Sequence, residues 1–248
     1  PANVLTLDGP APFITVNNGS FTNDVVTTGS LGINVNGGTA ASSLVLAQAN
    51  TFTGDVTVNA GTGGNLTLFV RNAGGLGGSA VASNSIVLVG NTSTRALLSL
   101  ATPGASYPAH NNLVMRPSGA STSSRAELRS VNGNATWNGT ISLDGWSGST
   151  SPRCDIYNDA GSSTLTINGN ILDLNAYIGQ MSLRGANPGI INGNINVPGA
   201  TVAKDDGGTG TINSETNVWG KTAVLAGTLR LGRENALPAT TTLTVGGG

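Results

Sequence analysis

The sequence predicts an all-β protein, a right-handed parallel β-helix (β-solenoid) that forms a single elongated domain. Composition is the first reason: of 248 residues only 9% are charged, and 37 are glycine. An average soluble domain has roughly 25% charged residues. The net charge is -1 and Val, Ile and Thr are frequent, whereas disordered chains combine high net charge with few β-branched residues. The chain is therefore expected to fold, with strands and turns rather than helices.

Short alternating segments are the second reason. They recur about every ten residues, with Gly, Asn, Asp, Ser or Pro between them, as expected for strands joined by turns. No segment has apolar residues at helical spacing over three turns. The segment 125–131 fits either a single helical turn or a strand. The strands predicted along the chain are 4–7, 13–16, 31–35, 44–46, 56–58, 66–70, 86–89, 97–100, 113–115, 140–143, 164–167, 171–174, 195–197, 222–225, 228–231 and 241–245.

An internal repeat is the third reason. Asn50–Leu68 and Asn217–Leu231 each contain an Asn, an aromatic residue and a Gly, then a short strand closed by Ala-Gly, then another alternating strand. Asn-Gly-Asn also recurs, at Asn168–Asn170 and Asn192–Asn194 among other places, where Asn suits turns because it tolerates positive φ and bonds to turn backbone. Short strands alone would also fit a sandwich or a barrel, but repeats favour stacked coils of roughly 20–30 residues, about 8–12 in all.

These observations predict one continuous solenoid over residues 1–248. The clearest repeat copies are 44–91 and 201–248. The irregular, polar stretches 103–124 and 145–152 are predicted to be excursions from the coil.

The two copies resemble the autotransporter-associated β-strand repeat. The residues that carry the resemblance are Asn50–Gly61, Leu66–Leu68 and Asn72–Gly77 in the first copy, and Ala226–Gly232 followed by Asn235–Pro238 in the second. The resemblance covers about a third of the chain and is more specific for architecture than for activity. It implies an exported parallel β-helix at the bacterial cell surface.

Charge and hydropathy limit the partners. The 11 Lys and Arg residues are spread along the chain, so no nucleic-acid partner is predicted. The nearest approach to a basic cluster is Arg116, Arg125 and Arg129, with Glu127 among them, and it is not favoured as a binding patch. No apolar run approaches the roughly 20 residues that a membrane helix needs, so no membrane insertion of this segment is predicted.

Carboxylates are candidate catalytic groups because glycosidases need two facing a groove. Asp155 and Asp159 could share a strand face with Tyr157, and stacking could bring Asp173 near. The favoured interpretation is that Asp159-Ala160-Gly161 is a turn and Asp155 a solvated strand residue, because no supporting acid, His or Arg is evident in a matched register. No catalytic residue is predicted.

No metal or cofactor site is predicted either. Asp205–Gly208 offers acidic oxygens to calcium, but a turn is favoured because the Gly-Gly-x-Gly-x-Asp spacing fails. His110 lacks partner ligands and is expected in a turn or at the surface. Gly74–Gly78 resembles a phosphate loop, but neither Lys-Ser/Thr nor a helix follows it.

The cysteine and tryptophans complete the candidates. Cys154 is the single cysteine, which excludes an internal disulfide, and it is expected to be a buried, inert thiol. An exposed Trp could stack on a sugar. Trp146 is the tryptophan proposed for carbohydrate contact, whereas Trp219 is expected to pack under a turn. For Trp137 the sequence does not decide between these two roles. Inward positions of the narrow coil are expected to be aliphatic and rarely aromatic.

The function predicted from the sequence is a non-enzymatic, exported structural or adhesive β-solenoid, a building block or stalk of a surface fibre or layer. Open solenoid ends are unpaired sheet edges. The expected partners are therefore further copies, joined end to end or by strand exchange, or neighbouring surface-protein repeats, with a glycan as another candidate. The alternatives are a polysaccharide-binding or depolymerising β-helix, tailspike- or lyase-like, and a calcium-stabilised adhesin.

Overall fold

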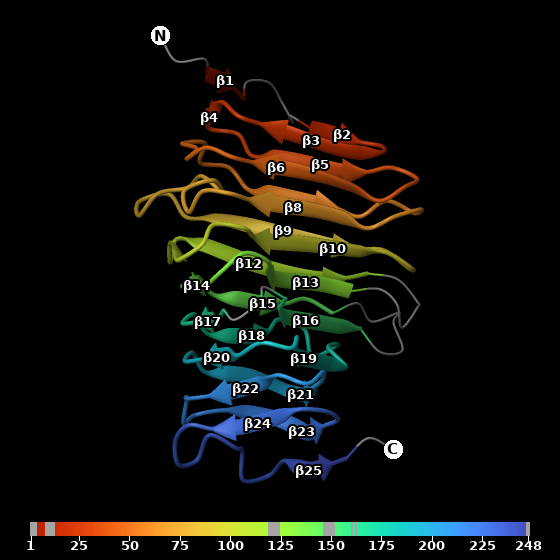
Figure 1. Cartoon of the computed structure of the whole chain (residues 1–248), viewed down its shortest axis with the longest axis vertical. Helices are drawn as coiled ribbons and strands as arrows, with labels where there is room; N and C mark the ends of the chain where they lie inside the picture. The colour runs from red at the N-terminus through yellow and green to blue at the C-terminus, as the bar shows by residue number, and fades with distance from the viewer. Residues whose placement is uncertain are drawn as a thin grey trace.

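The computed structural model describes residues 4–7, 13–118, 125–145, 152–159, 161 and 163–246. Within these ranges the chain forms strands and turns and no helix, so a parallel β-helix of one elongated domain is confirmed. Figure 1 shows the strands stacked along the long axis, with the two termini at opposite ends. No described segment forms a helix that could cross a membrane.

The strands lie in three ladders, and every ladder pairing is parallel. The first ladder contains β2 (Phe13–Val16), β5 (Ile33–Gly37), β7 (Val56–Asn59), β9 (Asn84–Gly90), β12 (Asn111–Pro117), β15 (Ile141–Leu143) and β18 (Ile171–Asp173). The second contains β3 (Gly19–Asn23), β6 (Ser42–Leu46), β8 (Leu66–Val70), β10 (Arg95–Leu100), β13 (Arg125–Ser130), β16 (Arg153–Asn158), β19 (Gln180–Arg184) and β25 (Thr242–Val245). The third contains β11 (Ala105–Tyr107), β14 (Ala135–Trp137), β17 (Leu165–Ile167), β20 (Gly189–Ile191), β22 (Thr209–Ile212) and β24 (Thr228–Leu231).

Three further features complete the topology. The long strands β21 (Ile195–Lys204) and β23 (Val218–Val224) pass through both the first and the second ladder, which joins these two into one 17-stranded sheet. A bulge in β21 between Val197 and Thr201 turns the corner between them. At the N-terminal end β1 (Val4–Thr6) pairs with β4 (Val26–Thr28).

The core is a column of apolar side chains inside the coils. Strands such as β9 alternate buried and partly exposed residues, because successive side chains point to opposite faces. The register stacks like on like: Val35, Val58, Leu88, Met115 and Leu143 follow one another in the first ladder, and each is 0% exposed. Burying each such side chain contributes about 2 kcal/mol.

The coils are not all of one length. Ile141 pairs with Ile171, and Ile171 pairs with Ile195, so the second of these coils is the shorter, and both agree with the predicted range. The segment 125–131, open between helix and strand, forms β13. Strands such as β20 and β22 escaped prediction because their short, glycine-containing sequences have little alternation; pairing with neighbouring coils supplies their order.

Much of the predicted excursion 103–124 is coil. Residues 105–107 and 111–117 form β11 and β12, which pair in register with β14 and β15. The prediction was wrong for β11, because Pro103 and Pro108 lie beside it and prolines in sequence indicate an irregular loop, whereas the strand predicted at 113–115 lies within β12. Residues 119–124 and 146–151, which make up most of the remaining predicted excursion sequence, lie outside the described residues.

The repeated Asn links three coils. Asn50 Oδ1 accepts from the Thr27 N–H at 2.8 Å, and its Nδ2 donates to the Gly75 carbonyl at 2.6 Å. Asn217 does the same in the second copy, accepting from Ile195 N–H at 2.9 Å and donating to the Ala236 carbonyl at 2.8 Å. Both amides are buried, so the motif supplies polar partners that the backbone at these corners lacks.

The Asn-Gly-Asn turns form a second device along one corner of the coil. Their first Asn residues bond side chain to side chain, with Asn168 donating to Asn138 and Asn192 to Asn168, each at 2.8 Å. Neither Asn168 nor Asn192 has positive φ, so that part of the predicted reason was wrong, but the predicted bonding to turn backbone occurs at Asn170, whose Oδ1 accepts from the Asn194 N–H at 3.0 Å. The glycines are required by close approach instead, because a Cβ on Gly169 would lie 1.7 Å from the Gly139 carbonyl oxygen.

Candidate functional site

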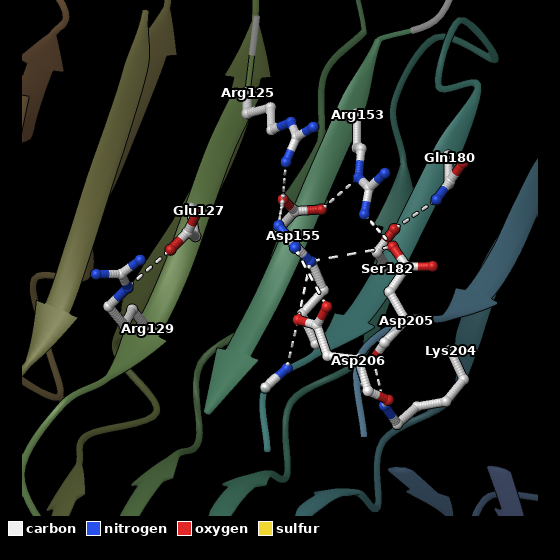
Figure 2. A network of polar contacts seen from close by, with 12 residues as sticks. Arg125, Glu127, Arg129, Arg153, Asp155, Gln180, Ser182, Lys204, Asp205 and Asp206 are labelled. Carbon is white, nitrogen blue, oxygen red and sulfur yellow. Dashed lines mark hydrogen bonds and ion pairs between the residues drawn. The ribbon is translucent and has the colours of Figure 1, made fainter. Parts of the chain in front are cut away.

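The outward side of the second ladder carries a dense set of charged side chains from β10, β13, β16 and β19. Register aligns them in three rows, which we name here. The arginine row is Arg95, Arg125 and Arg153; the carboxylate row is Glu127 and Asp155, continued by Ser182; the flanking row is Arg129, Tyr157 and Arg184. Figure 2 shows the carboxylates between arginines from neighbouring strands.

Asp155 is the centre of the set. Its Oδ1 accepts from Arg153 Nε at 2.7 Å, and its Oδ2 lies 3.3 Å from Arg125 Nη1 and 3.4 Å from Arg184 Nη1. The side chain is 0% exposed although it points away from the coil interior, because the arginines lie over it. A carboxylate so enclosed is compensated by three guanidinium groups from three coils.

Glu127 is held less completely. Its Oε1 accepts from Arg129 Nε at 2.8 Å, while its Oε2 lies 3.7 Å from Arg95 Nη1 without a hydrogen bond. Burial raises the pKa of Glu127, and the neighbouring charge of Asp155 adds to this rise, whereas Arg129 and Arg95 oppose it. The Glu127 carboxyl therefore takes up a proton more readily in the folded chain than a free carboxyl does.

The flanking row forms a stack. The Tyr157 ring lies between two guanidinium groups, 4.8 Å from Arg129 Cζ and 5.4 Å from Arg184 Cζ. Such cation–π contacts hold the arginines in place. Burial raises the pKa of the Tyr157 phenol, and the charges of Asp159 and Asp206 raise it further.

The turn after β21 closes the set. Arg153 Nη2 donates to Asp205, and Arg184 Nε lies 3.3 Å from Asp206 Oδ2. Asp206 has a φ of 63°, and its carboxylate also accepts from the Gly185 N–H at 3.1 Å. Burial opposes ionisation of Asp206, but the Gly185 N–H and Arg184 outweigh it and lower the pKa.

The chemistry that this arrangement supports is recognition and stabilisation. Glu127 and Asp155 have no solvent exposure and are engaged by arginines, so neither is placed to exchange protons with a bound substrate. Within the described residues, Arg125 Nε and Glu127 Oε2 are buried without a hydrogen-bond partner. The set is therefore tightly charged but not fully satisfied.

The prediction that Asp155 is a solvated strand residue was wrong. The sequence does contain arginines in matched register, since Arg125 pairs with Arg153 across the ladder, but they lie far apart in sequence and only the coil length brings them together. Asp159 follows β16 and lies 3.7 Å from Arg129. Asp173 does not join them: it lies on β18 in the first ladder and accepts from backbone N–H groups of Asn175 and Ala176.

The sequence cluster of Arg116, Arg125 and Arg129 is divided by the fold. Arg116 lies on β12 in the first ladder, where its Nε donates to Asp144 at 2.6 Å. Arg125 and Arg129 lie on β13 and contact Asp155 and Glu127. The cluster is thus divided between two ion-pair systems.

The remaining candidate residues lie in the core or in turns. Cys154 is buried, as predicted, and burial raises the pKa of its thiol well above the ordinary value. His110 lies in a turn, and Asp205 and Asp206 form the predicted turn with their carboxylates on arginines. Among the described residues no three His, Cys, Asp or Glu side chains are grouped to hold a metal. Gly74–Gly78 forms turns against the coil containing Phe52.

The structure describes two of the three tryptophans, and both are buried. Trp219 is 2% exposed and its Nε1 donates to Thr222 at 2.7 Å. Trp137 is 0% exposed and stacks on Tyr107 with ring centroids 6.1 Å apart, so aromatic residues are commoner inside the coil than the sequence led us to expect. Trp146, the residue proposed for carbohydrate contact, lies outside the described residues.

No family model, curated protein or solved structure matches this chain.

Proposed function

We propose that this chain is a non-enzymatic structural β-solenoid, a building block or stalk of an extracellular fibre or layer on a bacterial surface. The observation that carries the proposal is an apolar face at the C-terminal end of the stack. A solenoid with such a face is suited to continue by adding another coil.

The end face consists of inward positions that no coil covers among the described residues. Leu231 is 44% exposed, whereas Ile212, which occupies the same position one coil earlier, is 0% exposed. Leu243 and Val245 on β25 are 52% and 71% exposed. Together with Val224, Gly227, Thr228, Leu229 and Leu237 they line an apolar hollow of about 290 Å³.

We assign a second copy of this chain as the occupant. Among the described strands, β25 pairs only with β23 and β24 only with β22. Each therefore presents one edge of backbone N–H and C=O groups that no described strand pairs with. A parallel coil with the same strand spacing satisfies both edges and covers the apolar side chains at once. In another copy the described N-terminal strands β1, β2 and β3 are likewise each paired on one side only, so they offer edges for such a junction.

The surroundings of the charged groups and the composition support a structural rather than a chemical role. The carboxylates of Glu127 and Asp155 are enclosed by arginines, and the outer surface is otherwise rich in Thr, Ser and Asn. The 11 Lys and Arg residues in a chain of 248 leave few sites for trypsin-like cleavage outside a cell. The resemblance of both repeat copies to the autotransporter-associated β-strand repeat supports export to the cell surface.

The experiment compares the wild type with the double variant Leu243→Lys/Val245→Lys by analytical ultracentrifugation and negative-stain electron microscopy. The wild type is expected to form end-to-end assemblies that grow with concentration, and the variant to stay monomeric, because two charges would be buried at each junction. Val81→Lys is the matched control, since Val81 is 97% exposed in a turn away from the end face. A wild type that is strictly monomeric at high concentration would overturn the proposal, as would assembly that the double variant leaves intact.

A further inference from the structure

The arginine row is a regular array of cations on the side of the rod. Arg95, Arg125 and Arg153 are direct neighbours in register on β10, β13 and β16. Neighbouring parallel strands are about 4.8 Å apart, so the three side chains follow the rod axis at that repeat. Three arginines can align on successive coils only if the strands of those coils keep the same register. The column of buried side chains beneath them fixes that register.

The counter-charges of this row lie behind it. Glu127 and Asp155 are 0% exposed, whereas the side chains of Arg95, Arg125 and Arg153 are 34%, 19% and 18% exposed. Solvent therefore meets guanidinium edges along this line, and the carboxylate nearest the surface is that of Asp205, which is 12% exposed and bound to Arg153. Positive and negative charges are balanced over the whole set, but in this row the arginines lie outside and the carboxylates of Glu127 and Asp155 lie beneath them.

Each guanidinium keeps donors for an outside ligand. A guanidinium has five N–H donors. Toward described residues, Arg95 uses Nη1 in an ion pair, Arg125 uses Nη1, and Arg153 uses Nε and Nη2. Because buried carboxylates already hold these groups in place, little side-chain entropy remains to be lost when a ligand binds.

We infer that the arginine row binds a linear acidic polysaccharide with one carboxylate per sugar, lying along the rod axis. Arginine is suited to carboxylates because two parallel N–H donors match the two oxygens. A repeating carboxylate meets a repeating guanidinium, so recognition depends on the spacing of the coils and not on one pocket.

Two other ligand classes fit less well. Double-stranded nucleic acid needs many phosphate contacts spread over a broad basic surface, whereas this side of the rod offers a single row of three arginines. A neutral polysaccharide would need an aromatic platform. On this face Tyr157 has its ring between Arg129 and Arg184, and Phe69 lies on β8 in register with Ser99.

The test is isothermal titration calorimetry of the purified chain with oligogalacturonides of increasing length at low salt. Affinity is expected to rise steeply up to the trimer and then level off, because the row has three arginines. Arg95→Gln is expected to weaken binding about tenfold, since Arg95 is the most exposed of the row and the least engaged in the network. Arg71→Gln is the matched control: Arg71 is exposed just after β8, at the far end of the strand next to β10, and its loss should leave binding unchanged.

Several outcomes would overturn the inference. These are no binding by the wild type, equal weakening by Arg71→Gln, or equal binding of duplex DNA or a neutral glucan of similar length. If Arg95→Gln fails to fold, Arg95→Lys keeps the charge but loses the paired donors, and it is expected to bind more weakly than wild type. Heparin in a parallel titration separates sulfates from carboxylates, and a clear preference for heparin would reject the carboxylate. The row lies on the side of the rod, so a failure of end-to-end assembly does not bear on this site.

Discussion

Asp155 is a buried acid whose carboxylate contacts arginines on three different strands. Replacing it with Asn removes the charge while keeping the shape, and it leaves Arg125, Arg153 and Arg184 without their shared counter-ion. We expect Asp155→Asn to lower the free energy of unfolding by about 3 kcal/mol, because one partner of a buried ion pair is lost. Asp159→Asn is the control: its side chain is 48% exposed, and the loss should stay below about 0.5 kcal/mol. Equal losses in denaturant titrations would contradict this view of the network.

Glu127 and Asp206 should shift stability with pH in opposite directions. The folded-state pKa of Glu127 is raised, chiefly by burial, so the folded chain binds this proton more tightly than the unfolded chain does. Its contribution is therefore full below its ordinary value of 4.5 and is lost as pH rises through the raised folded pKa. Glu127→Gln should remove this declining component from a plot of unfolding free energy against pH.

For Asp206 the folded-state pKa is lowered, so its contribution is present above the ordinary value of 3.8 and is lost as pH falls through the lower folded pKa. Asp206→Asn should flatten the acid limb of the same plot. Parallel curves for the wild type and both variants would show that neither carboxyl is linked to folding.

At the scale of the element, the Asn of the repeat determines how successive turns are joined. Asn50→Ala leaves the Thr27 N–H and the Gly75 carbonyl without their partner at a buried corner. We expect a loss of about 3 kcal/mol, since two buried groups become unsatisfied. Asn168→Ala, in the exposed Asn ladder, should cost less than about 1 kcal/mol because water replaces the lost amide. Thermal unfolding of the two variants measures the difference.

The glycine stack between the third and first ladders predicts another contrast. A Cβ on Gly169 would lie 1.7 Å from the Gly139 carbonyl oxygen, so Gly169→Ala must push two coils apart. We expect a loss of about 3 kcal/mol or more. Gly199→Ala, whose Cβ would meet nothing within 4 Å, should be neutral or slightly stabilising. Chemical denaturation of both proteins tests this, and a tolerant Gly169 would mean that the coil spacing relaxes easily.

At the scale of the whole molecule, a stack of coils is nearly one-dimensional, and each coil depends on its two neighbours. Strand β25 is exposed along its length and pairs on one side, whereas β12 is paired on both sides. Hydrogen exchange read by mass spectrometry should therefore be fast in β25 and slow in β12. Protection of β25 should rise with protein concentration if another copy covers it. Uniform protection along the stack would instead indicate a single cooperative unit.

The sequence by itself determined the fold class. Low charge, β-branched alternation and turn residues at regular intervals are local properties, so strands such as β8 and β9 were predicted near their observed bounds. The repeated Asn and aromatic residues were also visible, because the same corner recurs with the same need for buried partners. Short strands such as β20 were missed since their order comes from neighbours and not from their own residues.

Only the tertiary structure decided which charges meet. Arg125 and Arg153 are neighbours because the coil between them has the length that brings them into register, and one residue more or fewer would have turned one of them inward. Coil lengths here differ, since the coil from Ile141 to Ile171 is longer than the coil from Ile171 to Ile195, so no fixed period in the sequence reveals the rows. The local residue pattern determines where a strand forms, but packing across the ladders determines which residues of successive coils are in register.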